Sequence, residues 1–265
     1  RAFTQDDAHI FCTSEQIEKE INKLIKNIYE IYKIFGFKEI KVELSTRPEN
    51  RVGSDEIWGK SESALKSALN SNDIDWLINE GDGAFYGPKI DFSLTDSLDR
   101  VWQLGTIQLD FSMPSRLDAN YIDSKGNKIA PVMIHRAILG SLERFVGILI
   151  EEYSGNLPLW LSPVHVTILN ITENQKSYCL EILKILKKSK IRSNMDLRNE
   201  KIGYKIREHT MLRTPYLLVV GDKELENGKI SVRTRLGDDL GEMSVENLIK
   251  MIETLVDKRS INLTI

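Results

Sequence analysis

The first twelve residues alternate in a way that is typical of a β-strand with one polar face. Read as a strand, this stretch places Gln5, Asp7 and His9 on one side, with Phe3 and Phe11 at either end of the same row. An ordinary half-buried strand would fill such a row with Val, Ile or Leu. The amide, carboxylate and imidazole groups therefore predict a surface that binds a small zwitterion or a metal ion.

Apolar residues then recur at helical spacing after the capping-box sequence Thr13-Ser14-Glu15-Gln16, and they continue up to Gly36. This pattern predicts one long amphipathic helix. Strands are predicted at residues 38–44, 85–94 and 100–111. Because no regular helical crossovers separate them, we expect an antiparallel sheet, with a helix around residues 136–152 packed across it.

The pattern changes after the proline-bounded segment 157–163, which we interpret as a domain boundary between residues 1–157 and 158–265. Beyond it, strands alternate with helical segments, which predicts a compact α/β domain with a mixed sheet. The predicted strands are 164–171, 191–197, 216–220 and 230–234, and the predicted first and last helices are 173–188 and 244–258.

Composition adds two limits. No apolar run approaches the roughly 20 residues that a membrane-spanning helix needs, and the two cysteines, Cys12 and Cys179, are too few for a disulfide framework. We therefore expect a cytoplasmic protein without a membrane partner.

Charge divides unevenly. From Pro158 onward the chain has 18 Lys and Arg against 14 Asp and Glu, which leaves 18 against 25 in the preceding part. A mildly basic second half suits a polyanion such as tRNA, although a difference of this size also occurs between ordinary domains.

A second informative segment covers residues 131–145. At helical spacing Gly140, Ser141, Arg144 and Gly147 share one stripe, so a cation projects from a surface where small residues leave room. This arrangement predicts a surface for a flat ligand such as a nucleotide.

Taken together, these segments resemble the threonyl-tRNA synthetases, which are class II aminoacyl-tRNA synthetases. Gln5–Cys12 resembles the stretch after the motif 2 loop, and Gly140–Phe145 resembles motif 3. Further matching segments follow in the family's order: Leu44–Glu49, Gly83–Ile90, Gly105–Phe111 and, for the anticodon-binding domain, Asp196–Glu208. The resemblance implies a class II antiparallel-sheet core, truncated at its amino end, followed by an α/β anticodon-binding domain.

The resemblance also implies an activity, namely ATP-dependent activation of threonine and its transfer to the 3′ end of threonine tRNA. It assigns one Zn²⁺ per active site to His9, His135 and a cysteine upstream of this chain, and Mg²⁺ accompanies ATP. Cys12 is not that cysteine, because strand alternation turns His9 and Cys12 to opposite sides.

Residue roles follow from the same resemblance. Catalytic roles fall on Arg144 and Lys89, and ATP binding on Arg144 and Gln103. Threonine binding falls on Gln5, Asp7, Tyr86, Thr106, Gln108 and Ser141, and anticodon reading on Asn199, Lys201, Glu224 and Arg233. Apart from the resemblance, their positive charge predicts that Lys201, Lys205 and Arg207 contact phosphates. Taken singly, the polar residues also fit a solvated strand face or a charged helix, and Arg144 fits a salt bridge to Glu143.

The chain departs from the family pattern at its start, where motif 1 and the motif 2 arginine have no counterpart. We therefore expect a carboxy-terminal fragment of a homodimeric enzyme that is a poor catalyst alone. The alternative is a non-catalytic RNA-binding protein derived from such a synthetase.

Overall fold

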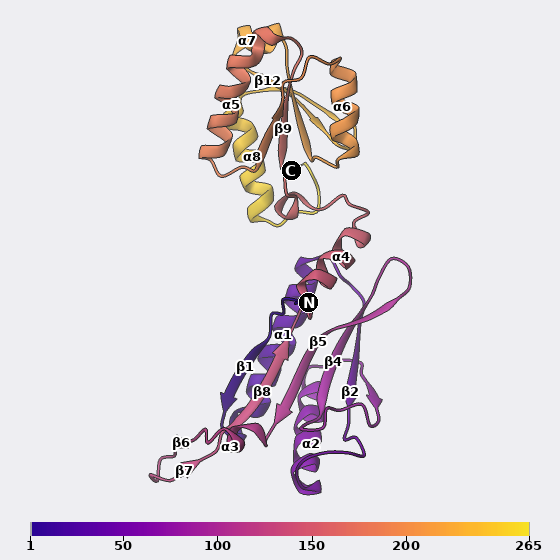
Figure 1. The fold of residues 1–265 in the computed structure, drawn as a ribbon, viewed down its shortest axis with the longest axis vertical. Helices are drawn as coiled ribbons and strands as arrows, with labels where there is room; N and C mark the ends of the chain where they lie inside the picture. The colour runs from indigo at the N-terminus through magenta and orange to yellow at the C-terminus, as the bar shows by residue number, and fades with distance from the viewer. Residues whose placement is uncertain (1, 265) are drawn as a thin grey trace. The chain divides into compact units, whose positions relative to one another are not determined.

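The computed structural model describes residues 2–264 and divides the chain into two compact units, Arg1–Glu152 and Tyr153–Ile265 (Figure 1). The boundary that the sequence predicts, after residue 157, lies in the segment between α4 (Leu142–Glu152) and the short helix η2 (Leu159–Leu161). Each unit is described by itself below.

Unit 1 is built on a six-stranded sheet with the order β1-β8-β5-β4-β2-β3. Neighbouring strands are antiparallel except β2 and β3, which are parallel. The predicted antiparallel sheet is confirmed. The strands are β1 (Ala8–Cys12), β2 (Ile40–Ser45), β3 (Leu77–Asn79), β4 (Lys89–Thr95), β5 (Val101–Asp110) and β8 (Val132–Ala137).

Two helices, α1 (Ile17–Ile34) and α2 (Asp55–Ser71), cover one face of this sheet (Figure 1). The predicted α1 begins after a capping box at Thr13, whereas α2, which is capped by the Ser54 side chain, was not predicted. Alternate strand residues such as Ile90, Phe92, Ile107 and Leu109 are fully buried. Strand alternation therefore turns the intervening polar residues to the opposite face.

The helix predicted around residues 136–152 is wrong in its first part. Strand β8 continues to Ala137, and helix α4 begins only at Leu142. Between them Gly140 has a positive φ of 63°, and a Cβ at this position would lie 3.1 Å from the carbonyl oxygen of Leu104. This left-handed turn ends the strand, so Gly140 and Ser141 do not belong to a helical stripe with Arg144.

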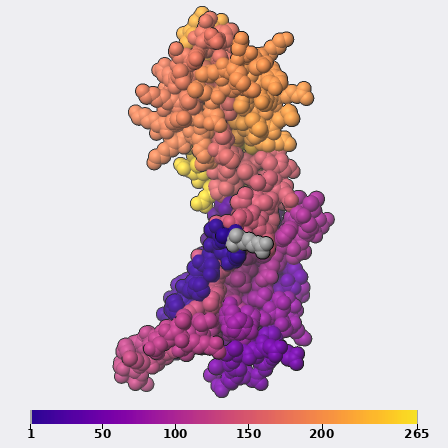
Figure 2. Space-filling model, viewed as in Figure 1, coloured from indigo at the N-terminus to yellow at the C-terminus, as the bar shows by residue number. Residues whose placement is uncertain are grey.

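The predicted first strand is also shorter than expected. Regular pairing starts at Ala8, and Gln5 is held by a single isolated bridge to Ser141. Arg1 lies outside the described residues. At the other end of β8, a hairpin of β6 (Tyr121–Ile122) and β7 (Lys128–Ile129) follows the short helix α3 (Met113–Arg116) (Figure 1). The hairpin region projects from the surface of unit 1 (Figure 2).

Unit 2 has a five-stranded sheet with the order β10-β9-β11-β12-β13. The first three strands are parallel and the last two are antiparallel, which confirms the predicted mixed sheet. The strands are β9 (Val166–Asn170), β10 (Ser193–Asp196), β11 (Tyr216–Val220), β12 (Ile230–Thr234) and β13 (Asp239–Met243).

Helices α5 (Lys176–Lys188) and α8 (Val245–Asp257) cover one face of this sheet and bury its main apolar core. Helix α6 (Ile202–Met211) lies on the other face (Figure 1). The single turn η3 (Glu173–Gln175) precedes α5, and α7 (Asp222–Asn227) follows β11. Among residues 2–264, no helix combines the length and the apolar character that crossing a bilayer requires.

Candidate functional site

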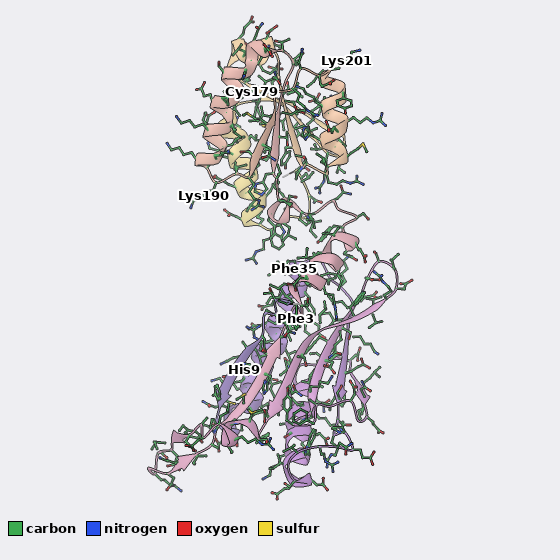
Figure 3. All side chains as sticks on the ribbon, viewed as in Figure 1. Phe3, His9, Phe35, Cys179, Lys190 and Lys201 are labelled. Atoms are coloured by element: carbon green, nitrogen blue, oxygen red, sulfur yellow. The ribbon has the colours of Figure 1, made fainter. Side chains whose placement is uncertain are left out.

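One residue from each of four neighbouring strands forms a polar row across the face of the unit 1 sheet that α1 and α2 leave open. His9 pairs with His135, His135 pairs with Gln108, and Gln108 pairs with Lys89. Directly paired residues point their side chains to the same side of a sheet. Strand register therefore brings together four predicted site residues that are far apart in the sequence; His9 is labelled in Figure 3.

The two histidine rings are in contact. Their centroids lie 4.6 Å apart in an edge-to-face arrangement, and His135 Nε2 lies 3.1 Å from Oδ2 of the fully buried Asp110. Burial acts to raise the pKa of Asp110, but His135 and the backbone N–H groups of Met113 and Ser112 outweigh it, so the pKa is lowered. An ionised Asp110 accepts a hydrogen bond from the Nε2–H group and leaves the His135 Nδ1 lone pair available to a ligand.

Tyr86 reaches this row from a loop that passes unusually close to the sheet. A Cβ at Gly87 would lie 1.7 Å from the Leu109 carbonyl oxygen, so only glycine fits there. The Tyr86 hydroxyl donates to Oε1 of Gln108 at 2.8 Å, and its ring centroid lies 5.3 Å from that of His135. Burial, followed by the charges of Asp110 and Asp7, raises the pKa of Tyr86. The phenol is therefore a neutral hydrogen-bond donor.

Asp91 connects three of the predicted residues. This buried carboxylate lies 3.0 Å from Lys89 Nζ and accepts hydrogen bonds from Thr106 Oγ1, at 3.2 Å, and from Gln103 Nε2. Burial acts to lower the pKa of Lys89, but Asp91 and then Asp82 outweigh it, so the pKa is raised and the amine stays charged.

A β-bulge explains why Gln103 reaches Asp91 at all. Gln103 and Thr106 are three residues apart, which in a regular strand would put them on opposite faces. The pairing between β4 and β5 shifts at Phe92 and Ser93, so Leu104 is an extra residue. The bulge restores Gln103 to the polar face.

Next to this row lies a cavity of about 550 Å³. Six of its lining residues carry side chains that suit a nucleotide and an amino acid: Phe3, Gln5, Gln103, Thr106, Ser141 and Arg144. The exposed Phe3 side chain is labelled in Figure 3.

Within this cavity Arg144 is available to a ligand. Its guanidinium lies 5.5 Å from the centroid of the Trp102 ring. The alternative interpretation required a salt bridge between Arg144 and Glu143. Glu143 instead accepts hydrogen bonds from the Thr4 N–H and the Ser141 hydroxyl. Among residues 2–264 Arg144 forms no ion pair.

Asp6 and Asp7 take different positions. The Asp6 carboxylate accepts hydrogen bonds from Arg136 and from the backbone N–H groups of Ile138 and Leu139, so it fixes the chain. Asp7 is exposed and contributes negative charge at Tyr86. Only Asp7 is therefore placed to meet a ligand.

The donor set of the polar row fits part of a metal site. Within residues 2–264 no group of three or more His, Cys, Asp or Glu side chains has a metal-binding arrangement. His9 and His135 supply two adjacent imidazoles, and Asp110 supports one of them. Cys12 is buried while His9 is exposed, which confirms that these two side chains face opposite ways.

Three of the predicted RNA-contacting residues of unit 2, Asn199, Lys201 and Glu224, lie beyond the carboxyl ends of the parallel strands β10 and β11, whereas Arg233 pairs with Leu217 near the amino end of β11. Asn199 and Lys201 are exposed between β10 and α6, where Lys201 is labelled in Figure 3. Glu224 on α7 is buried, and its carboxylate accepts hydrogen bonds from the Gly221 N–H and the Ser231 hydroxyl at 2.8 and 2.7 Å. Arg233 is two residues beyond Ser231 on β12, on the same face.

The predicted phosphate contact of Lys205 is wrong. This side chain is fully buried on the sheet-facing side of α6, whereas Lys201 and Arg207 are exposed. The Nζ of Lys205 donates to Asn170 O, Asn170 Oδ1 and Asp196 O at 3.1, 2.9 and 3.2 Å. Its charge is therefore used inside the domain.

Comparison with known proteins decides the family. Residues 1–153, more than half of the chain, match the family model described as the tRNA synthetase class II core domain (G, H, P, S and T). The chain belongs to the class II tRNA synthetase core family. Residues 164–255 of this class II chain also match the anticodon binding domain model.

Relatives identify the branch that this class II chain resembles. It is 58% identical over 259 residues to a threonine–tRNA ligase of Marinobacter nauticus, and the match covers 98% of this chain and 40% of the ligase. The predicted resemblance to threonyl-tRNA synthetases is therefore confirmed. The chain spans less than half the length of that relative.

Two solved structures agree. The RNA binding domain of threonyl-tRNA synthetase from Cryptosporidium parvum Iowa II superposes with a TM-score of 0.91 at 41% identity, covering 96% of this chain and 64% of that one. A putative threonyl-tRNA synthetase, ThrRS-1, from Aeropyrum pernix gives a TM-score of 0.80 at 26% identity, covering 99% and 65%. These structures confirm the predicted fold class.

Three residues of this class II site were not identified from the sequence as site residues. Asp91 and Asp110 organise the row from inside the sheet, and Phe3 lines the cavity. A signal for Asp91 exists, because a carboxylate between Ile90 and Phe92 turns away from the apolar face. Asp110 stands at the end of β5, where alternation gives little guidance.

Proposed function

We propose that this chain provides the amino-acid and ATP site and the anticodon-binding domain of a threonine–tRNA ligase. The observation that carries the proposal is the row His9–His135–Gln108–Lys89, which lies beside the cavity that contains Arg144. The row offers polar contacts for a small zwitterion, and the cavity offers a planar cation and an aromatic ring. Threonine and ATP together require both.

Threonine binds over the polar row. The neutral Tyr86 hydroxyl and the Gln108 amide hold each other in place, and Asp7 accepts the hydrogen bond of the threonine hydroxyl. Gln5, Thr106 and Ser141 complete the pocket on the side of the cavity. A site that hydrogen-bonds the hydroxyl rejects valine strongly, because valine leaves these polar groups unpaired.

His9 and His135 hold one Zn²⁺ in this proposal, with a third protein ligand from residues that this chain does not contain. When bound, Zn²⁺ offers open coordination positions to the amino and hydroxyl groups of threonine. The contribution of Asp110 is to fix the tautomer and the orientation of His135. The adjacent imidazoles and the buried carboxylate support this assignment.

ATP occupies the cavity with its adenine between Phe3 and the guanidinium of Arg144, and Mg²⁺ accompanies its phosphates. Gln103 lines the same cavity and contacts ATP there, and Asp91 orients the Gln103 amide. The threonine carboxylate attacks the α-phosphorus in line and pyrophosphate leaves, so threonyl-adenylate forms. No protein nucleophile is needed. Arg144 and the charged Lys89 neutralise developing negative charge, and the rigid sheet positions the reactants.

The second unit binds the anticodon loop of threonine tRNA. Asn199 and Lys201 approach it from the exposed segment before α6, and Glu224 and Arg233 approach it from the edge formed by α7 and β12. Amide, carboxylate and guanidinium groups hydrogen-bond the edges of unstacked loop bases. Homodimer formation and a cytoplasmic location belong to the same proposal for the complete enzyme, and the two free, buried cysteines suit a reducing compartment.

The alternative is a non-catalytic RNA-binding protein that keeps the anticodon-binding domain. Such a protein has no use for a paired, carboxylate-supported histidine row, which is why the enzyme is favoured. Both proposals include RNA binding, but only the enzyme activates threonine with ATP. The deciding experiment therefore measures this activation.

That experiment compares the 265-residue chain with an extended form, in which the chain is joined to the upstream residues of the Marinobacter relative. Zinc content and threonine-dependent ATP–pyrophosphate exchange are measured for both. We expect near-stoichiometric zinc and exchange in the extended form, and loss of both in its His135→Ala variant. His209→Ala is the control, because this histidine is also paired with an aspartate but lies in unit 2. If neither form exchanges pyrophosphate while both bind threonine tRNA, the RNA-binding alternative is correct.

A further inference from the structure

The buried lysine of unit 2 has every proton bonded inside the protein. Lys205 has no exposed surface, and its three donors meet three acceptors: the carbonyl and side-chain oxygens of Asn170 and the carbonyl of Asp196. A buried ammonium group is unfavourable unless it is fully hydrogen-bonded. A cation retained at this cost calls for a role that an apolar side chain cannot fill.

The acceptors of Lys205 mark the ends of two neighbouring strands. Asn170 is the last residue of β9, and Asp196 is the last residue of β10. Because these strands are parallel, both lie at the same edge of the sheet, where the following loops begin. Lys205 therefore joins the loop after β9 to the loop after β10 and to helix α6, on which it lies.

The loop after β10 is held on both sides. Asp196 accepts hydrogen bonds from the backbone N–H and the Nε of Arg198 at 3.1 and 3.0 Å, and its carboxylate lies 3.0 Å from His209 on α6. Asn199 and Lys201, the proposed RNA-contacting residues, stand between Asp196 and Lys205. Their segment is fixed by Asp196 at its start and by α6 at its end.

The contacts continue to a third loop. Asn170 Nδ2 donates to Thr172 O at 2.7 Å, and the Thr172 N–H donates to Gln175 Oε1 at 2.7 Å. The fully buried Gln175 in turn donates to Asp222 Oδ1 at 2.6 Å. Asp222 is the first residue of α7, the helix that carries Glu224.

We infer that Lys205 is a positioning residue for RNA recognition, which holds the Asn199–Lys201 segment in fixed register with the helix that carries Glu224. This inference rests on the proposed function, in which both segments contact one anticodon loop. An apolar residue in place of Lys205 leaves the Asn170 and Asp196 carbonyl oxygens without a donor, and the two loops lose their common anchor. Preorganised loops bind RNA with less loss of conformational entropy than mobile ones.

A double-mutant cycle tests this role. The dissociation constant of the 265-residue chain is measured for a threonine tRNA transcript and for a copy with one anticodon base replaced. Lys205→Met and Asn199→Ala are made singly and together. We expect Asn199→Ala to reduce the preference for the cognate transcript by about tenfold in the unaltered chain, and by less than about twofold in the Lys205→Met background.

The control is Lys184→Met on α5, which lies across the sheet from α6. Lys184 is exposed, and within residues 2–264 it forms no ion pair. This variant also loses one lysine, so it corrects for net charge. We expect it to leave the cognate preference unchanged.

Additive effects in the cycle overturn the positioning role while the reading role of Asn199 stands. If Asn199→Ala leaves the cognate preference of the unaltered chain unchanged, the proposed reading role of Asn199 is wrong. The inference about Lys205 is then wrong as well. If Lys205→Met does not fold, Asn170→Ser takes its place. It removes the Asn170 Oδ1 acceptor and the Thr172 contact but leaves both carbonyl oxygens to Lys205. We expect Asn170→Ser to couple with Asn199→Ala in the same direction but with a smaller magnitude. Additive effects of these two substitutions again overturn the positioning role of Lys205.

Discussion

His9 and His135 lie near opposite ends of the unit 1 sequence, yet they are directly paired partners on β1 and β8, with ring centroids 4.6 Å apart. Strand register alone creates this pair. A slip of one residue between β1 and β8 would turn one imidazole toward α1 and α2 and away from the polar row. The proposed zinc site therefore depends on the pairing of two strands as much as on the histidines themselves.

Replacing Asp110 by Asn should weaken zinc binding without removing a ligand. The amide keeps the shape of the carboxylate but loses the charge that fixes the His135 tautomer at 3.1 Å. We expect zinc affinity to fall by about 10- to 100-fold in the extended form, measured by competition with a chelator. Asp123→Asn in the exposed β6–β7 turn is the control. Equal affinities in the two variants would show that Asp110 does not support a metal ligand.

Gly87→Ala should be strongly destabilising, because its Cβ would lie 1.7 Å from the Leu109 carbonyl oxygen. We expect a loss of at least about 3 kcal/mol in the free energy of unfolding of unit 1, together with displacement of Tyr86 from Gln108. The matched control is Gly147→Ala on the exposed side of α4, where a Cβ meets no atom within 4 Å. That variant should gain about 0.5–1 kcal/mol, because alanine favours a helix. Urea unfolding followed by circular dichroism compares the two, and similar stabilities would refute the steric argument.

The shared face of Thr106 and Gln108 could be recognised from the sequence because strand alternation is local, whereas Gln5 and Asp7 lie before β1, where alternation does not place them. The same reasoning failed at Gly140 and Ser141, where helical spacing suggested a stripe with Arg144. A left-handed turn at Gly140 separates β8 from α4, and the close Leu104 carbonyl that requires glycine there comes from another strand. Local periodicity has no access to such a contact.

Buried polar residues that orient other side chains or loops were the hardest to predict from the sequence. Asp91, Asp110 and Lys205 are buried, and each is defined by partners on other elements. From sequence alone a lysine on an amphipathic helix is most simply interpreted as a surface charge, which is how Lys205 was misassigned. Burial depends on the tertiary packing of α6 on β9 and β10, and one helix does not encode it.

Arg144→Lys should impair the use of ATP, since lysine keeps the charge but loses the planar fork that stacks on a base and binds phosphates. In the extended form we expect kcat/KM for ATP in pyrophosphate exchange to fall by about 100-fold. Arg100→Lys is the matched control. Its guanidinium lies 5.3 Å from the same Trp102 ring but is paired with Asp96 and Glu151, and Arg100 is absent from the cavity lining. Equal losses in both variants would mean that Arg144 serves only the packing of Trp102.

Unit 2 should lose stability in acid through His165. This residue is 3% exposed, and burial, followed by the charge of Arg192, outweighs a backbone contact with Leu159 and lowers its pKa to about 4. The unfolded chain binds a proton near the ordinary pKa of about 6.5, so the unfolded state takes up more protons between these values. The contribution of His165 is therefore fully present above about pH 6.5 and is lost as the pH falls toward 4.

Between pH 7.5 and pH 4.5 this difference corresponds to roughly 2–3 kcal/mol. Because other groups also titrate, the measurement is the difference in pH dependence between the unaltered chain and His165→Met, by amide hydrogen exchange of the β9 and β11 strands. Methionine cannot be protonated, so the variant should lose less stability in acid by about that amount. Parallel pH profiles would show that the buried imidazole is protonated in the folded protein at no cost.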